Sequence, residues 1–139
     1  MAVDRTRNTK DSRQVTIILA LTVAWLGLWT HEFYRIPLAR GLTPDGSLPL
    51  LAIALLLLIW WLRAADKRAA TWALLVYGLI NAVGGILSVL PLPILPFVPE
   101  QTLDHYLVHT WYALCQIPLI VVALGAALAY RRKGRPGLR

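Results

Sequence analysis

Four long stretches of the chain contain no Asp, Glu, Lys or Arg, and they constrain the fold more than any other feature. They are Gln14–His31, Gly46–Leu62, Ala69–Pro99 and His105–Tyr130. A helix of about 17–25 apolar residues is long enough to cross the hydrocarbon core of a membrane, which is roughly 30 Å thick. Three of the stretches fit one crossing each. The longest, Ala69–Pro99, has four prolines after Leu90. Because proline interrupts a helix, this stretch also predicts one crossing, which ends near Leu90.

The sequence therefore predicts an all-α, integral membrane four-helix bundle. We expect its helices at approximately residues 14–34, 47–62, 69–90 and 101–130, within a membrane domain 14–130 flanked by basic tails at 1–13 and 131–139. The composition agrees, since 58% of the residues are hydrophobic and 15% are charged, whereas a soluble domain has about 25% charged residues. A cleaved signal peptide is the alternative for the first stretch. Its long apolar run and the lack of an Ala-x-Ala motif before His31 favour a retained helix.

The distribution of basic residues predicts the orientation. Of the 14 Lys and Arg residues, all but Arg35 and Arg40 fall in the two tails or in the link 63–68, which share one side of a four-helix topology. Because Lys and Arg gather on the cytoplasmic side, we expect both termini in the cytoplasm and a multi-pass protein of the bacterial inner (cytoplasmic) membrane. The net charge of +7 is then explained by topology and by contact with the lipid bilayer. It does not indicate nucleic acid, because no stacking aromatic residues lie among the basic ones.

The predicted third helix carries a stripe of small and polar residues. Thr71, Gly78, Asn81, Gly85 and Ser88 recur at helical spacing, and small residues let membrane helices approach closely. Asn81 lies near the middle of the membrane and needs a hydrogen-bond partner there. That partner is expected within the bundle, in a second copy of the chain or in a ligand.

The predicted fourth helix has the most informative pattern. His105, His109, Tyr112 and Gln116 are spaced by four, three and four residues, so their side chains share one face. This face begins at the outer surface and reaches about mid-membrane. It is expected to point into the bundle, because polar side chains are costly against lipid. Pro118 follows and predicts a kink or a polar gap next to Gln116.

These features place one polar cluster in the outer half of the bundle. Every histidine of the chain is expected at this level, together with a carboxylate at the end of the first helix. The candidate site comprises His31, Glu32, Asn81, Ser88, His105, His109, Tyr112 and Gln116.

A metal ion or a haem is one class of ligand for this cluster. His105 and His109, at i and i+4, present two imidazoles on one face, as zinc-binding helices do, and Glu32 or His31 would be the third ligand. Zinc and copper suit such ligands. A haem would instead use His31 and either His105 or His109 as axial ligands from facing helices. In both cases the protein would be a membrane redox protein or metalloenzyme.

Two further activities, proton-coupled transport and nucleophilic catalysis, agree with fewer features of the sequence. In a small proton-coupled transporter, Glu32 would be the titrating group. The middle of the first helix has no acidic residue, however, so any likeness to small multidrug exporters is one of size and helix number only. In a nucleophilic enzyme, Ser88 would need His105 or His109 within about 3 Å. Cys115 is expected to be inert in its apolar surroundings.

The interpretation that we favour is non-catalytic. The protein is then an accessory, interaction or ligand-binding bundle in which the polar cluster is hydrogen-bonded internally or holds a ligand. The stripe on the third helix and the Leu-rich second helix suit contacts with a larger membrane protein complex or with a second copy in a homo-oligomer. The identity of the ligand and the oligomeric state stay open at this point.

Overall fold

The described part of the chain is entirely helical. The computed structural model describes residues 2–35, 48–96 and 98–133, and within these it describes the side chains of 12–31, 48–96 and 98–131. Its helices are α1 (Ala2–Arg35), α3 (Leu48–Arg63), α4 (Arg68–Leu87) and α5 (Leu103–Lys133), and these ranges contain no strand. The prediction of an all-helical fold with four helices is confirmed.

Three of the helices are long and apolar enough to cross a membrane. The segments that qualify are Ser12–His31 in α1, Arg68–Leu87 in α4 and Leu103–Arg131 in α5. Helix α3 is apolar but has only 16 residues, which corresponds to about 24 Å and is shorter than the usual hydrocarbon core. These helices point to association with a membrane. Three of the four expected crossings correspond to helices that are long enough to span the hydrocarbon core.

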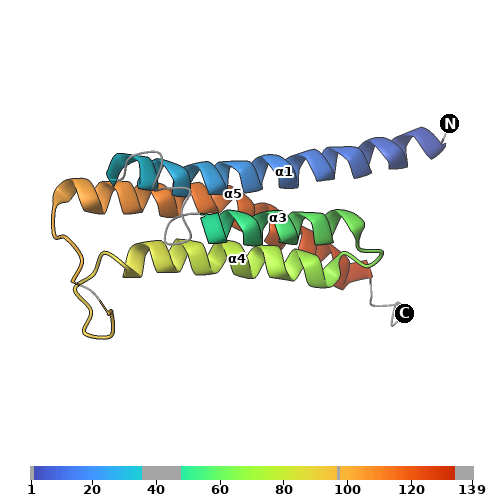
Figure 1. Ribbon diagram of the computed structural model, residues 1–139. Helices are drawn as coiled ribbons and strands as arrows, with labels where there is room; N and C mark the ends of the chain where they lie inside the picture. The colour runs from blue at the N-terminus through green and yellow to red at the C-terminus, as the bar shows by residue number, and fades with distance from the viewer. Residues whose placement is uncertain (1, 36–47, 97, 134–139) are drawn as a thin grey trace.

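The helices run antiparallel to their neighbours, and α5 lies between α1 and α4 (Figure 1). The two interfaces of α5 are the largest in the bundle, whereas α3 packs less extensively, on α4 and α1. Glycine permits the closest approach: a Cβ built on Gly27 of α1 would lie 2.2 Å from Cβ of Cys115 on α5. Helix α5 is therefore the element against which the others are positioned.

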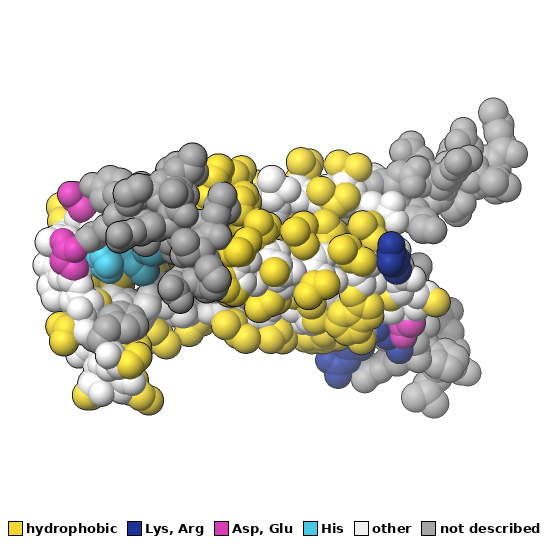
Figure 2. All heavy atoms as spheres, in the orientation of Figure 1, with side chains coloured by type: hydrophobic (Ala, Val, Ile, Leu, Met, Phe, Trp, Pro, Cys, Tyr) yellow, Lys and Arg dark blue, Asp and Glu magenta, His cyan; other side chains and the backbone are white. Residues whose placement is uncertain are grey.

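Two ends of the bundle differ in charge. At one end, which we call the basic end, Arg13, Arg68 and Tyr130 meet: the Arg68 guanidinium donates to the Tyr130 carbonyl (3.0 Å) and Arg13 lies over the Tyr130 ring. At the other end lie the three histidines, and we call it the histidine end. Figure 2 shows Lys and Arg side chains at the first end, histidines and most acidic side chains at the second, and hydrophobic side chains between them.

Most of the outward side chains between the two ends are apolar. Leu56, Ile80 and Val121 are each more than 60% exposed, on three different helices. A contiguous apolar surface of this extent is unusual for a protein that faces water. It is typical of helices that face lipid.

The helix ends differ from the expected ones in a consistent way. Helix α1 begins at Ala2, and α5 continues to Lys133, so each extends into a segment expected to be a basic tail. The change from apolar to charged residues marks the end of a membrane span, but it does not stop a helix. Helix α4 ends at Leu87, with Ser88 as its C-cap, before the prolines rather than at them, and α5 begins two residues later than expected.

Candidate functional site

All three histidines of the chain meet at the histidine end. The Nε2 atoms of His31 on α1 and His109 on α5 are 2.7 Å apart, and their rings stand nearly perpendicular, at 80°. His105 lies one turn before His109, with the two ring centroids 4.6 Å apart. We call these three residues the histidine cluster. His109 is buried, whereas His31 and His105 are half-buried.

Helix α4 fixes the orientation of the His109 ring. Nδ1 of His109 lies 2.7 Å from the carbonyl oxygen of Gly85. A carbonyl can only accept, so Nδ1 carries the hydrogen and, in the neutral ring, Nε2 presents its lone pair. That lone pair faces Nε2 of His31, which is the donor in the contact between the two rings. The Gly85 carbonyl thus selects the tautomer in which His109 offers an acceptor nitrogen.

Gly85 is also a steric requirement of the site. A Cβ at this position would lie 2.7 Å from Cδ1 of Tyr112, closer than real Cβ contacts. Only glycine lets α5 come close enough to α4 for His109 to reach the backbone carbonyl.

The polar face of α5 continues from His109 into the bundle. The Tyr112 hydroxyl donates to Oδ1 of Asn81, whose Nδ2 donates to the Tyr77 carbonyl (2.8 Å). One turn further, Nε2 of Gln116 donates to the Ala24 carbonyl of α1 (2.9 Å). Gln116 is 1% exposed, and its Oε1 has no hydrogen-bond partner among the described residues. The structure places His109, Tyr112 and Gln116 on one inward face of α5.

Ser88 is not arranged as a nucleophile. Its Oγ lies 3.3 Å from Nδ1 of His109, but it donates its hydrogen to the Gly85 carbonyl (3.1 Å). Nδ1 of His109 donates to the same carbonyl. A general base must accept the proton of the serine, and here that nitrogen is already a donor.

The metal ligands expected from the sequence are only partly brought together. His109 faces His31 on α1, and the His105 ring lies beside that of His109, tilted by 32°, rather than across from it. Glu32 follows His31 in α1, but its side chain lies outside the described residues. Among the described side chains, no group of three or more His, Cys, Asp or Glu could hold one metal ion. Among the expected metal ligands, the described residues therefore bring only His31 and His109 face to face.

A haem does not fit between the facing histidines. Its axial ligands bind iron from opposite faces of a large macrocycle, whereas Nε2 of His31 and Nε2 of His109 are in direct contact. One turn below, Gly27 packs against the side chain of Cys115. Helices α1 and α5 therefore lie too close together to admit a porphyrin.

Pro118 affects the other side of α5. It lies on the exposed side of the helix, as does Leu114, whose carbonyl it leaves without an intrahelical partner. Gln116 is buried on the opposite side. Gln116 does not bond to this carbonyl but donates to the Ala24 carbonyl of α1.

Two interhelical bonds were not anticipated from the sequence. Trp61 Nε1 donates to Oγ1 of Thr71 (3.0 Å) in the interior near the basic end. Trp111 Nε1 donates to Oγ1 of Thr30 (3.1 Å) on the exposed side of the α1–α5 interface. A tryptophan near a helix end can also anchor the helix at the membrane interface, and pattern alone does not distinguish that role from a bond to a threonine on another helix.

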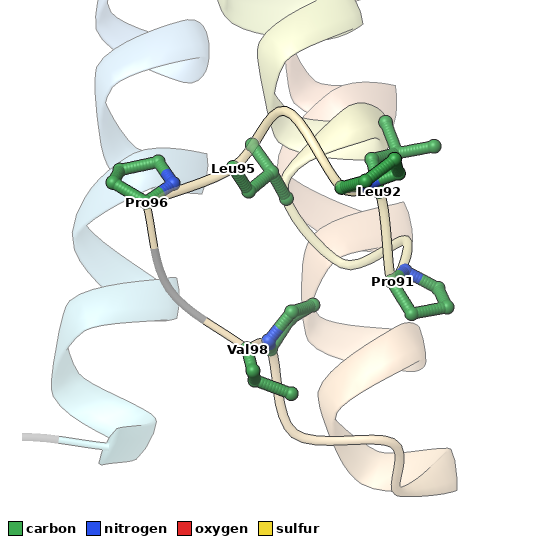
Figure 3. A pocket seen from close by; sticks show the side chains of 7 residues that line it. Pro91, Leu92, Leu95, Pro96 and Val98 are labelled. Atoms are coloured by element: carbon green, nitrogen blue, oxygen red, sulfur yellow. The ribbon is translucent and has the colours of Figure 1, made fainter.

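The proline-rich segment after α4 encloses a separate hollow. Pro91, Leu92, Leu95, Pro96 and Val98 line this cavity of about 360 Å³ together with two further prolines (Figure 3). Its lining has no titratable side chain, and Val98 is 91% exposed. The hollow is thus lined by apolar side chains, whereas the histidine cluster contains imidazoles, which can bind protons and metal ions.

Comparison of the chain with protein-family models, with curated proteins and with solved structures gives no match. The function must therefore follow from the geometry of the chain itself.

Proposed function

We propose that this chain is a non-catalytic accessory protein of the inner membrane that binds a ligand at its histidine cluster. The observation that carries the proposal is the 2.7 Å contact between Nε2 of His31 and Nε2 of His109. A neutral amide or hydroxyl would join two helices as well as an imidazole does. Imidazole nitrogens, in contrast, bind protons and metal ions at ambient pH, so two facing imidazoles favour a binding site over a simple structural bond.

Binding fits the surroundings of the cluster better than catalysis or transport. The serine nearest to His109 donates its proton elsewhere, which argues against nucleophilic chemistry. Below the cluster, α1 and α5 are held together by Gly27 against Cys115 and by the bond from Gln116 to Ala24. This closed interface argues against a route for substrate along α5.

The proposal includes a topology of four crossings with both termini in the cytoplasm. It is supported by the gathering of basic side chains at the end where α1 begins and α5 finishes. The histidine cluster then opens to the outer side. A reporter fused after Arg139 is expected to read as cytoplasmic, and one inserted at Asp45, which lies outside the described residues, as external. Reversed readings would overturn this topology.

The ligand-site role is tested by comparing two buried polar pairs. Thr71→Val removes the acceptor of the Trp61 bond, and His31→Leu removes one imidazole of the facing pair. A structural bond stabilises the fold, whereas binding sites are often kept at the expense of stability. We therefore expect Thr71→Val, in the fully buried pair, to lower the melting temperature in detergent more than His31→Leu does. A loss in His31→Leu as large as in Thr71→Val would show that the cluster is structural.

A further inference from the structure

We propose that the connection between α4 and α5 lies in the membrane interface, with its apolar side chains against lipid acyl chains. We call residues 91–99 the proline loop, and its described residues are 91–96, 98 and 99. The partner is thus the lipid surface at the histidine end, on whichever side of the membrane that end lies. This inference goes beyond the proposed function, because the histidines take no part in it.

The proline loop leaves the bundle sideways, at the end of the candidate membrane spans. The span in α4 ends at Leu87, and the span in α5 begins at Leu103. Figure 1 shows the connecting segment extending to the side of the bundle, beyond α4, rather than across the helix ends. Because the helices are expected to cross the membrane, a segment that leaves their ends sideways runs along the membrane surface.

The described side chains of the proline loop are all apolar, and several point outward. Ile94 is 86% exposed and Val98 is 91% exposed. The chain has no charged residue from Ala69 to Pro99, so the loop continues the apolar surface that Ile86 and Leu87 expose at the end of α4. An exposed apolar patch marks a site of interaction. Continuity with the lipid-facing surface of α4 favours lipid as the partner of this one.

The backbone of the proline loop exposes few hydrogen-bond donors. Unpaired N–H groups are costly in lipid, and this cost keeps most irregular segments out of the membrane. Proline has no N–H group, and four of the eight described residues of the loop are prolines, namely Pro91, Pro93, Pro96 and Pro99. The N–H of Leu92 donates to the Leu90 carbonyl (2.7 Å), and that of Leu95 to the Leu92 carbonyl (3.1 Å). The loop can therefore enter the interface at low cost, while its carbonyls stay within reach of water among the headgroups.

Hydrogen bonds at its base hold the proline loop in shape. Nε2 of Gln101 donates to the carbonyls of Val89 and Pro99, at 3.0 Å each, and so joins the two ends of the loop. The Tyr106 hydroxyl donates to Oε1 of Gln101. The hollow that the loop encloses (Figure 3) is lined by residues without a polar side chain, so no side chain is placed to hold water there. The loop thus presents its apolar side chains in a preformed arrangement.

The test measures what surrounds the proline loop in nanodiscs of phosphatidylcholine and phosphatidylglycerol, in which both membrane faces are accessible. Val98→Cys and Ile94→Cys are each labelled with an environment-sensitive fluorophore. Cys115 is buried, and wild-type protein treated in the same way gives its background. Quenching by aqueous iodide is compared with quenching by a nitroxide on the lipid acyl chains. We expect blue-shifted emission from both labels, strong quenching by the nitroxide and little quenching by iodide.

Two exposed positions elsewhere calibrate the quenchers. Val121→Cys lies on the exposed apolar side of α5, and its label is expected to respond to the nitroxide and not to iodide. Ala65→Cys lies in the link between α3 and α4, beside Asp66, and its label is expected to respond mainly to iodide. Gel filtration checks the fold of each variant, and all four positions are exposed, so the substitutions are expected to be tolerated.

The ratio of nitroxide to iodide quenching decides the outcome. A ratio at Val98 and Ile94 closer to that of Val121→Cys supports lipid contact. A ratio closer to that of Ala65→Cys would overturn the proposal, because the loop would then face water. Protection from both quenchers would also overturn it and would point to a covering protein surface, such as a second copy of the chain. None of these results bears on the histidine cluster, so the proposed function stands or fails separately.

Discussion

The two ends of the bundle each bury a polar pair between helices, and the pairs differ in chemistry. Near the basic end, the indole N–H of Trp61 meets the hydroxyl of Thr71, and both residues are almost fully buried. At the histidine end, the ring nitrogens of His31 and His109 face each other, and His31 is half-buried. In the first pair, one donor meets one acceptor, and the bond serves only to join the two helices. The second joins two imidazoles, whose nitrogens can bind a proton or a metal ion at ambient pH.

The ends also achieve close packing by different means. The basic end uses large side chains, with Trp61 of α3 inserted beside a core that includes Ile17, Leu74 and Leu119. Towards the histidine end, Gly27 and Gly85 instead bring α1 and α4 directly against α5. The basic end therefore combines a buried tryptophan with small and aliphatic side chains, whereas glycines at the other end bring the Gly85 carbonyl beside His109.

The largest expected effect is that of Gly27→Ala. The new Cβ would lie 2.2 Å from Cβ of Cys115, so α1 and α5 must separate, and overpacking of this kind costs about 3 kcal/mol. Unfolding of the purified protein in detergent measures the loss. Gly125→Ala is the control, since a Cβ there meets nothing within 4 Å, and it is expected to be neutral or slightly stabilising. Similar stabilities of the two variants would contradict the close approach of these helices.

Gly85→Ala is expected to have the next largest effect. Its Cβ would lie 2.7 Å from Cδ1 of Tyr112, so the ring must move, at a cost of about 2 kcal/mol. The same shift displaces the carbonyl that holds His109, so ligand binding at the histidine cluster is expected to weaken as well. The neighbouring Gly84→Ala has open space around its Cβ and is expected to change neither quantity. An equal effect of both substitutions would point to helix propensity rather than to contact.

The helices and the polar face of α5 could be predicted because each depends on local periodicity. Charge-free runs marked the helices, and a spacing of four, three and four residues placed His105, His109, Tyr112 and Gln116 on one face. Helix ends were predicted less well. Nothing in a basic segment stops a helix, so α1 continues back to Ala2.

The partners of the site residues could not be predicted, because they depend on how helices are rotated against each other. The tautomer of His109 is fixed by a backbone carbonyl, and a carbonyl leaves no mark in the sequence. Gly85 was expected to allow close approach, but its role as the acceptor was not foreseen. The contact between His31 and His109 also depends on interhelical distances of tenths of an ångström, which residue spacing does not determine.

Thr71→Val tests the basic end on its own. It leaves the buried N–H of Trp61 without its acceptor, and an interhelical hydrogen bond in a membrane is worth about 1 kcal/mol. A double-mutant cycle with Trp61→Phe isolates this term from the change in indole packing. We expect a coupling energy of about 1 kcal/mol in detergent. Additive losses would mean that Trp61 stabilises α3 through packing alone.

The smallest expected effect is that of Tyr112→Phe, and it addresses where the site ends. The substitution removes the hydroxyl bond to Asn81 but keeps the ring against Gly85, so the expected loss is about 0.6 kcal/mol. If the polar row below His109 only joins helices, the affinity of the histidine cluster for its ligand stays at the wild-type value while stability falls by this amount. If affinity falls severalfold at the same small cost in stability, Tyr112 positions His109, and the site extends from the histidine pair towards the middle of the bundle.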